Sequence, residues 1–263
     1  MIVHVASISD PRLDDYRNVP DPELLRARGV FVAEGRHVVR RLLTESRFTT
    51  RSLLLTPTAE QSLSDLLPSL DAIPVFVVSQ EAMNAITGFN IHRGCLALGE
   101  RPPLRSWDSL ARDARRLVVL EQVSNADNVG AIFRNAAAFG VDAVLIGPAC
   151  TDPLYRKAIR TSMGAALRLP FAMMEAWPGD LKRLQAQGFR LMALTPAADA
   201  QALNDVKPAN RVALLVGHEG HGLSAEALAA ANLRVRIPMA DGVDSLNVAI
   251  ATAIALYALG RDD

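Results

Sequence analysis

Short, uniformly apolar segments recur through the C-terminal half of the chain, and helix-like segments lie between most of them. The apolar segments are 116–123, 142–147, 190–195, 211–217 and 233–239. Strands that are apolar at every position, and not only at alternate positions, are typical of a parallel sheet whose two faces are both covered by helices. The pattern therefore predicts an α/β fold with a parallel sheet covered by helices, whose ligand site lies at the carboxyl ends of the strands.

The N-terminal part of the chain has a different pattern. Residues 31–46 have the spacing of an amphipathic helix, and 51–56 and 74–79 have that of short strands. Pro102 and Pro103 interrupt the periodicity, because proline continues neither a helix nor a sheet well. We therefore expect a small α/β domain at 1–100, a linker at 101–115 and a second domain at 116–263.

The composition narrows the class of protein. Of the 263 residues, 50% are hydrophobic and 21% are charged, as in globular domains. No apolar run reaches the about 20 residues of a membrane span, and we see no secretory signal, so we expect a cytoplasmic protein without a membrane partner. Cys95 and Cys150 lack zinc-binding spacing, so we expect no metal. Because the formal net charge is zero, any nucleic-acid site must be a local patch.

A polar loop and a helix follow the strand at 116–123, in the segment EQVSNADNVGAIFRNAAAFG (121–140). We expect Asn128 to cap the helix, since asparagine accepts hydrogen bonds from the first free N–H groups. Arg134 stands among apolar residues in the sequence, where a guanidinium needs an anionic or polar partner. A capped helix with a solvated arginine is the alternative interpretation.

The second informative loop is LLVGHEGHGLS (214–224). Its glycines match neither the dinucleotide-binding fingerprint nor the phosphate-binding loop. Glycine still lets a backbone approach a ligand closely, so this segment is either a ligand-binding loop or an ordinary tight turn. His218 and His221 flank Glu219 without the helical spacing of a zinc site, so we expect solvated histidines.

The third loop is IPMADGVDSLNVAIA (237–251), which leads into the last helix. We expect Ser245 or Asp244 to cap that helix, because their short side chains accept hydrogen bonds from free N–H groups. Capping by Ser245 or Asp244 does not explain the role of Asn247.

Together the three loops resemble the signature motifs of the SpoU branch of the SPOUT superfamily of RNA methyltransferases. The matching residues are Asn128, Gly130 and Arg134 in the first motif, Gly217, Glu219 and Gly222 in the second, and Ile237, Pro238, Met239, Ser245, Leu246 and Asn247 in the third. Ala126 and Asn135 depart from the proline and threonine that are frequent in the first motif. Segments 31–43 and 92–99 are similar to a small RNA-binding domain found ahead of many SpoU enzymes.

The resemblance implies methyl transfer from S-adenosylmethionine to the ribose 2′-hydroxyl of a structured RNA, ribosomal or transfer. It also implies a C-terminal trefoil knot and a homodimer with cofactor pockets near the subunit interface. The expected cofactor contacts are Gly217, Ile237, Met239 and Leu246. The expected catalytic residues are Asn128, Arg134, Glu219, Ser245 and Asn247. In this assignment Arg134 holds the phosphate next to the hydroxyl, and Glu219 orients Arg134 or Asn128.

Basic residues outside these motifs are candidates for RNA contacts. They are Arg36, Arg40, Arg93, Arg156 and Arg160, with Arg41, Lys157 and Arg168 as further candidates. Two other functions remain open on the sequence. One is a catalytically silent RNA-binding or ribosome assembly factor with the same fold, and the other is a nucleotide-dependent oxidoreductase, which the missing dinucleotide fingerprint disfavours.

Overall fold

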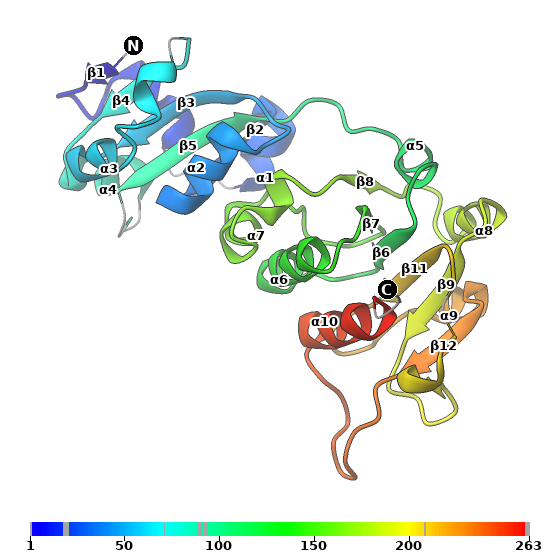
Figure 1. Ribbon diagram of the computed structural model, residues 1–263. Coiled ribbons are helices and arrows are strands. Elements are labelled where there is room, and N and C mark those ends of the chain that lie inside the picture. The colour runs from blue at the N-terminus through cyan, green and yellow to red at the C-terminus, as the bar shows by residue number, and fades with distance from the viewer. Residues whose placement is uncertain are drawn as a thin grey trace. The chain divides into compact units, whose positions relative to one another are not determined.

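The computed structural model describes residues 2–17, 21–70, 72–88, 91, 94–207 and 209–260. The chain divides into two compact units, each formed by two segments (Figure 1). Unit 1 comprises Met1–Pro103 and Leu154–Arg168, and unit 2 comprises Leu104–Pro153 and Leu169–Asp263. The second segment of unit 1 thus lies inside the range 116–263 that the sequence assigned to a single domain.

Over its described residues, unit 1 has a five-stranded sheet in the order β1-β4-β3-β5-β2. The strands are β1 (Ile2–His4), β2 (Val30–Glu34), β3 (Thr50–Leu55), β4 (Val75–Val77) and β5 (Cys95–Glu100). The pairs β1–β4 and β3–β4 are parallel, whereas β3–β5 and β2–β5 are antiparallel. The strands predicted at 51–56 and 74–79 are confirmed as β3 and β4.

The helix predicted over 31–46 is wrong in its first part. Residues 30–34 form β2, and the helix α2 is Arg36–Thr44. Gly35 lies between them with a φ of 94°, a conformation that glycine adopts without strain. Phe31 packs edge-on against Phe48 with ring centroids 5.3 Å apart, and this burial is what favours the strand.

Short helices complete unit 1. They are η1 (Pro11–Tyr16), α1 (Asp21–Glu23), η2 (Leu24–Arg28), α3 (Pro57–Ser62), η3 (Leu67–Ser69), α4 (Gln80–Thr87), α7 (Arg156–Thr161) and η4 (Ala165–Leu167). Ala158 and Ile159 of α7 are fully buried. The Arg156 N–H donates to the Asp21 carboxylate at 3.0 Å, so apolar packing and polar contacts both hold α7 within unit 1.

Unit 2 has a seven-stranded sheet over its described residues, in the order β10-β12-β9-β11-β6-β7-β8, and every pair is parallel. The strands are β6 (Arg116–Leu120), β7 (Ala143–Ile146), β8 (Phe171–Met173), β9 (Arg190–Leu194), β10 (Gln201–Ala202), β11 (Val212–Val216) and β12 (Leu233–Arg236). The predicted α/β fold with a parallel sheet is therefore confirmed, and β8 and β10 are strands that the sequence did not reveal.

Helices cover both faces of this sheet. They are α5 (Trp107–Ala111), α6 (Ala126–Ala138), α8 (Gly179–Ala186), α9 (Ala225–Ala230) and α10 (Val248–Leu259), with the short η5 (Leu203–Asp205). Leu117 and Val119 of β6 share one core with residues of α5, α8 and α9. Val118 and Leu120 point to the opposite face and are also fully buried. Burial of both faces explains why these strands are apolar at every position.

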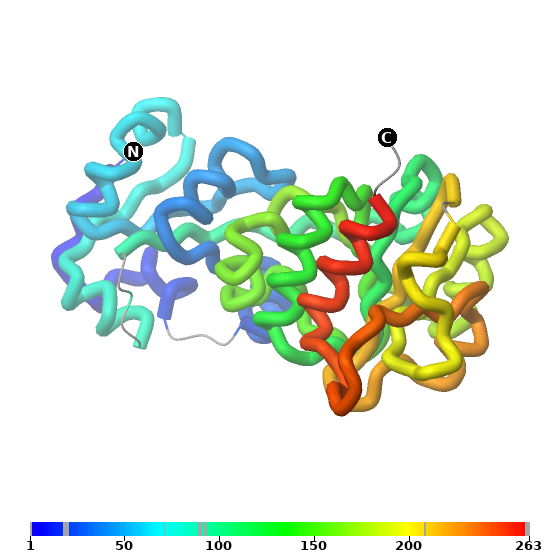
Figure 2. Tube along the Cα trace, turned by 60° about the horizontal axis from the view of Figure 1, so that its bottom comes forward, coloured from blue at the N-terminus to red at the C-terminus, as the bar shows by residue number. Residues whose placement is uncertain are grey.

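Helices α6 and α10 lie side by side (Figure 2). The Asn135 amide of α6 donates to the Ala249 carbonyl of α10 at 2.8 Å. Strand order and register do not define how the C-terminal segment is threaded, so the trefoil knot stays a prediction. Among the described residues, no helix is long and apolar enough to cross a membrane.

Candidate active site

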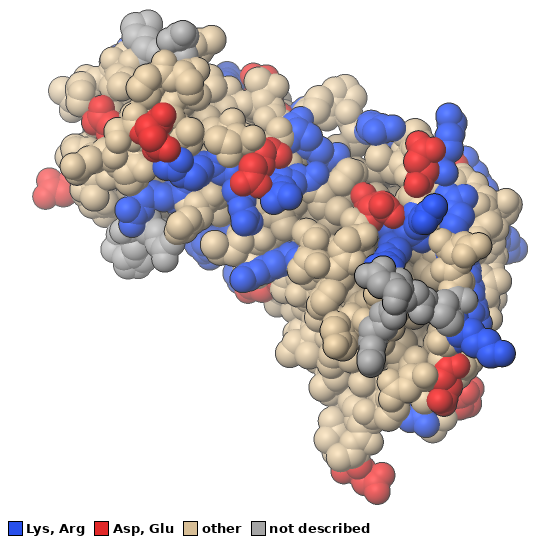
Figure 3. Space-filling view, in the orientation of Figure 1, with Lys and Arg blue, Asp and Glu red and all other residues tan. Residues whose placement is uncertain are grey.

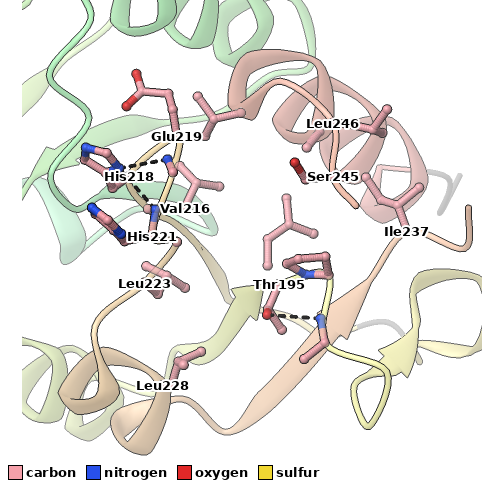
Figure 4. Close-up of a pocket in the computed structure, with 18 of the residues that line it drawn as sticks. Thr195, Val216, His218, Glu219, His221, Leu223, Leu228, Ile237, Ser245 and Leu246 are labelled. Atoms are coloured by element: carbon pink, nitrogen blue, oxygen red, sulfur yellow. Dashed lines mark hydrogen bonds between the residues drawn. The ribbon is translucent and has the colours of Figure 1, made fainter. Parts of the chain in front are cut away.

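A cavity of about 360 Å³ opens at the carboxyl ends of β9, β11 and β12. Its walls come from the loops after β9 and β11 and from the segment between β12 and α10. Figure 4 shows His218, His221 and Glu219 on one side of the opening and Ile237, Ser245 and Leu246 on the other. The position agrees with the rule that ligands bind beyond the carboxyl ends of parallel strands.

Four residues that the sequence assigns to cofactor contacts line this cavity: Gly217, Ile237, Met239 and Leu246. Glu219 and Ser245, two of the expected catalytic residues, line it as well. The loop after β9 was missed by the sequence analysis, although Thr195 and Pro196 also line the cavity. Adjacency of β9 and β11 in the sheet brings this loop to the site, and strand order was not available from periodicity.

The loop after β11 closes on itself through its backbone. The His218 N–H donates to the Gly222 carbonyl at 3.0 Å, and the Gly222 N–H donates to the His218 carbonyl at 2.9 Å. A Cβ on Gly217 would lie 2.4 Å from the Gly222 carbonyl carbon. A glycine at 217 is therefore required by the close approach of the loop's own backbone.

His218 has a structural part in the same loop. Its Nδ1 accepts hydrogen bonds from the N–H groups of Gly220 at 2.8 Å and His221 at 3.2 Å, so the ring proton belongs on Nε2. The two histidine rings stack with centroids 4.8 Å apart. The expectation of freely solvated histidines is therefore wrong for His218. No cluster of potential metal ligands occurs within the described part of the chain.

Three polar side chains from different motifs form one hydrogen-bonded chain. The Asn128 amide donates to Glu219 Oε1 at 2.7 Å, and the Asn247 amide donates to Asn128 Oδ1 at 3.0 Å. Asn128 is buried, and both polar atoms of its side chain are used. Glu219 thus orients Asn128, which is one of the two alternatives left open by the sequence.

The predicted helix caps are wrong at both helices. Asn125, and not Asn128, caps α6, because its side chain accepts from the Asp127 N–H at 2.8 Å. Asn247, and not Ser245 or Asp244, caps α10, since its Oδ1 accepts from the N–H groups of Ala249 and Ile250. Asn247 therefore uses its oxygen as a cap and its NH₂ group in the chain with Asn128.

Arg134 lies apart from this chain. It is exposed on α6 and forms no hydrogen bond or ion pair with any described residue. Six residues separate it from Asn128, about 600° around a helix, so the two side chains point in different directions. Asn135 lies on the side of Asn128 and faces α10. Arg134 is thus exposed and not enclosed by the apolar residues around it in the sequence, and the anionic partner expected for it stays a prediction.

Cys150 lies in the loop after β7 and is half-buried. Burial raises the pKa of its thiol to about 11. At neutral pH the sulfur stays protonated and is a weak nucleophile.

Several basic residues predicted to bind RNA are paired with acids in unit 1. Arg40 donates to both oxygens of Asp65, at 2.6 and 2.8 Å, and this hydrogen bonding lowers the pKa of Asp65. Arg156 and Arg160 both donate to Glu34 Oε2, at 3.3 and 3.1 Å.

The remaining basic candidates differ in their contacts. Arg168 pairs with Glu45 at 2.7 Å, and Arg41 donates to the Met163 carbonyl. Arg36 is exposed and has no hydrogen bond or ion pair within the described residues. Arg93 lies outside the described residues. Figure 3 shows blue and red side chains close together over the region of α2.

Comparison with known proteins gives three consistent findings. A model of the SpoU rRNA Methylase family matches residues 115–257. An uncharacterized tRNA/rRNA methyltransferase of Mycobacterium tuberculosis is 45% identical over 260 residues, which cover 96% of this chain and 90% of that protein. The 23S rRNA (guanosine(2553)-2′-O)-methyltransferase RlmP of Bacillus subtilis is 26% identical over 97% of this chain and 98% of its own length.

The fold is similar to solved structures over its whole length. The AdoMet-bound rRNA methyltransferase from Sinorhizobium meliloti superposes with a TM-score of 0.84 at 26% identity, covering 99% of this chain and 98% of that one. An RNA 2′-O ribose methyltransferase superposes with a TM-score of 0.78, also at 26% identity, over 99% and 98% of the two chains.

Proposed function

The chain belongs to the SpoU rRNA Methylase family, and on that premise we propose that it transfers a methyl group from S-adenosylmethionine to a ribose 2′-hydroxyl of a structured RNA. The family, the methyltransferase class and the cofactor predicted from the sequence are confirmed by the comparisons. They give no support to a catalytically silent factor. The observation that carries the proposal is the cavity beyond the carboxyl ends of the sheet, which the second and third motifs line and to which Asn128 of the first motif is joined by hydrogen bonds with Glu219 and Asn247.

The cavity has the chemical features that S-adenosylmethionine needs. Its walls combine apolar side chains, among them Leu223, Ile237 and Leu246, with the backbone of the glycine-containing loop after β11. An adenine ring fits an apolar slot whose backbone groups supply hydrogen bonds. We assign the cofactor contacts to Gly217, Ile237, Met239 and Leu246. When bound, S-adenosylmethionine supplies an electrophilic methyl group on its sulfonium sulfur.

The protein's own groups orient the nucleophile. A ribose hydroxyl attacks well only as its proton leaves, yet a guanidinium stays protonated in proteins and is a poor general base. Arg134 therefore binds the phosphate beside the target ribose and polarises its hydroxyl. Asn128 and Asn247 hold Glu219, which lines the cavity, through their hydrogen-bonded chain. Ser245 also lines the cavity and would lie beside the methyl group of the bound cofactor.

We further propose that the active form is a homodimer. Ile250, Ile254 and Tyr257 of α10 are 55%, 38% and 59% exposed and recur every three to four residues, so they form one apolar stripe. Val243 and Leu246, ahead of the helix, are also exposed. Such a stripe beside the cavity fits a second copy of the chain whose cover completes the site. Sedimentation should give a dimer for the native chain and a monomer for Ile254→Asp.

Unit 1 is the proposed RNA-binding part, through Arg36, Arg40, Arg93, Arg156 and Arg160. The support is the concentration of arginine around α2 and α7 and the sequence resemblance of 31–43 and 92–99. The substrate is a ribosomal or transfer RNA, as the names of the relatives indicate for those proteins. We place the reaction in the cytoplasm, where both RNAs are found.

One experiment tests the reaction directly. Total RNA from cells with and without the protein is mapped for 2′-O-methyl groups, and the site that disappears is then prepared as a substrate for the purified enzyme. A matched RNA with a 2′-deoxy nucleotide at the target should bind and remain unmethylated, since the nucleophile is missing while the backbone contacts persist. Methyl label on a base of the deoxy substrate would contradict the ribose assignment.

A further inference from the structure

Glu121 is a buried carboxylate that the proposed chemistry does not use. It follows β6 directly and is 1% exposed. It forms no ion pair with any described Lys, Arg or His. Acidic side chains are rarely buried this fully without a cation, because removing a charge from water is costly unless hydrogen bonds replace the lost hydration. Its hydrogen bonds therefore indicate what the residue does.

Both oxygens of the Glu121 carboxylate accept a hydrogen bond from an N–H group. Oε1 accepts from the indole Nε1 of Trp177 at 2.8 Å, and Oε2 accepts from the backbone N–H of Ser224 at 2.9 Å. The backbone N–H of Glu121 donates to the Val216 carbonyl at 2.9 Å. Val216 and Ser224 are the two residues that flank the loop Gly217–Leu223. Glu121 thus contacts both ends of the loop that forms one wall of the cavity.

Each of these contacts is itself anchored. Ser224 is the N-cap of α9, where its side chain accepts from the Ala227 N–H at 3.1 Å. The Trp177 ring lies against the end of β7, because a Cβ on Gly147 would be 3.0 Å from it. The carboxylate therefore connects the loop to α9 on one side and to β7 on the other.

We propose that Glu121 is a positioning residue that holds the loop Gly217–Leu223 in the shape that binds S-adenosylmethionine. Two part-buried N–H donors converge on Glu121. A carboxylate offers an acceptor oxygen to each of them, whereas a side-chain amide has only one acceptor oxygen. A glutamine of the same shape would turn its NH₂ group toward one of the two donors. The loop end at Ser224 or the indole of Trp177 would then lose its partner and move.

The proposal rests on the proposed function, since it assigns a residue to the same cofactor site. The test is the Glu121→Gln variant of the full chain, titrated with S-adenosylmethionine by calorimetry and assayed with the RNA substrate. We expect the Kd and the KM for S-adenosylmethionine to rise at least about 10-fold, because the loop loses its fixed shape. The kcat and the KM for RNA should stay within about 3-fold, since no group at the reacting atoms has changed.

Asp180 provides a matched control. It is also 1% exposed, and it accepts from the Ala176 N–H at 2.9 Å and pairs with Arg183, but unlike Glu121 its hydrogen bonds do not reach either end of the loop Gly217–Leu223. Asp180→Asn should lower the melting temperature and leave the Kd for S-adenosylmethionine unchanged. A second variant is Trp177→Phe in the Glu121→Gln background, which removes the donor that clashes with the glutamine NH₂ group and should recover part of the affinity.

The outcomes separate the two proposals. If Glu121→Gln lowers the melting temperature like Asp180→Asn while its Kd stays native, Glu121 is only a structural residue and the inference is wrong. If Trp177→Phe in the Glu121→Gln background weakens binding further, the donor conflict is not the cause and the inference is again wrong. Failure of the proposed function looks different, because the native chain itself would then neither bind S-adenosylmethionine nor methylate RNA.

Discussion

Polar side chains at the cavity of unit 2 form hydrogen bonds with one another, whereas several arginines of unit 1 form ion pairs with acidic side chains. The Asn128 amide reaches Glu219 at 2.7 Å within the fold, and Arg40 reaches Asp65 at 2.6 Å on an exposed face. The first arrangement is organised before any ligand arrives. In the second, the RNA binding proposed for unit 1 requires an arginine to exchange its carboxylate partner for a phosphate, which costs little because exposed pairs are weak. The difference suggests a fixed cofactor site and an adaptable RNA surface.

Arg134 is the exception to this contrast. It belongs to a signature motif of unit 2, yet it is exposed and has no hydrogen-bond or ion-pair partner within the described residues. Arg134→Ala should lower kcat about 1000-fold, since a charge-assisted contact made mainly in the transition state is lost. The Kd for S-adenosylmethionine, measured by calorimetry, should stay within about 2-fold. Arg134→Lys should recover little, as an ammonium cannot replace the planar fork. A large loss of cofactor affinity would instead place Arg134 inside the cavity.

Gly217→Ala should have the next largest effect, because it disrupts the closed loop Gly217–Leu223 itself. The new Cβ would lie 2.4 Å from the Gly222 backbone, so the loop has to open. We expect the Kd for S-adenosylmethionine to rise at least about 10-fold. Gly220→Ala is the matched control in the same loop, because its Cβ would lie 3.5 Å from the His218 ring, an ordinary contact. Equal losses in both variants would mean that the closed shape of the loop is unimportant.

Asn247→Asp separates the two uses of this side chain. The aspartate still caps α10 but cannot donate to Asn128, so we expect kcat to fall about 10-fold with little change in thermal stability. Asn247→Ala removes both contacts and should also cost about 1 kcal/mol of the free energy of unfolding. Steady-state kinetics and thermal unfolding of both variants check these expectations. Native kcat in the aspartate variant would show that the hydrogen-bonded chain is dispensable.

Substitutions of Arg36 and Arg40 should have the smallest effects. They compare an unpaired with a paired arginine among the described residues of unit 1. Arg36 has no described partner, whereas Arg40 is held by Asp65. Arg36→Ala should weaken RNA binding about 5-fold and lower the slope of log affinity against log salt by about 1, since one phosphate contact is lost. Arg40→Ala should change affinity less, because Asp65 already balances its charge. RNA titrations of both variants at several salt concentrations test this difference. A larger loss of affinity in Arg40→Ala than in Arg36→Ala would contradict it.

The sequence predicted the strands of unit 2 better than the helix caps and side-chain burial beyond the strand ends. The apolar segments 116–123, 142–147, 190–195, 211–217 and 233–239 are all strands, because burial of both faces leaves a clear pattern. The caps were misplaced by two or three residues, since several neighbouring Asn, Asp and Ser side chains are all suitable acceptors. The burial of Glu121 and the exposure of Arg134 depend on tertiary neighbours, which local spacing does not show.

In unit 1 the errors have a different origin. The segment 31–46 joins a buried strand to an amphipathic helix through Gly35, and the apolar residues of both parts fit one helical pattern. The strand β5 was not predicted, because its residues 95–100 include no β-branched or aromatic side chain.

The division of each unit into two segments has a consequence for evolution and for proteolysis. The chain passes between the units after Pro103, after Pro153 and after Arg168. A single cut in the 103–104 region would leave α7, with its buried Ala158 and Ile159, on the fragment that carries unit 2. Neither unit can then be released whole by one protease site. By the same reasoning, a gene fusion at one junction cannot replace unit 1 as a whole, because its two segments are separated in the sequence by a segment of unit 2.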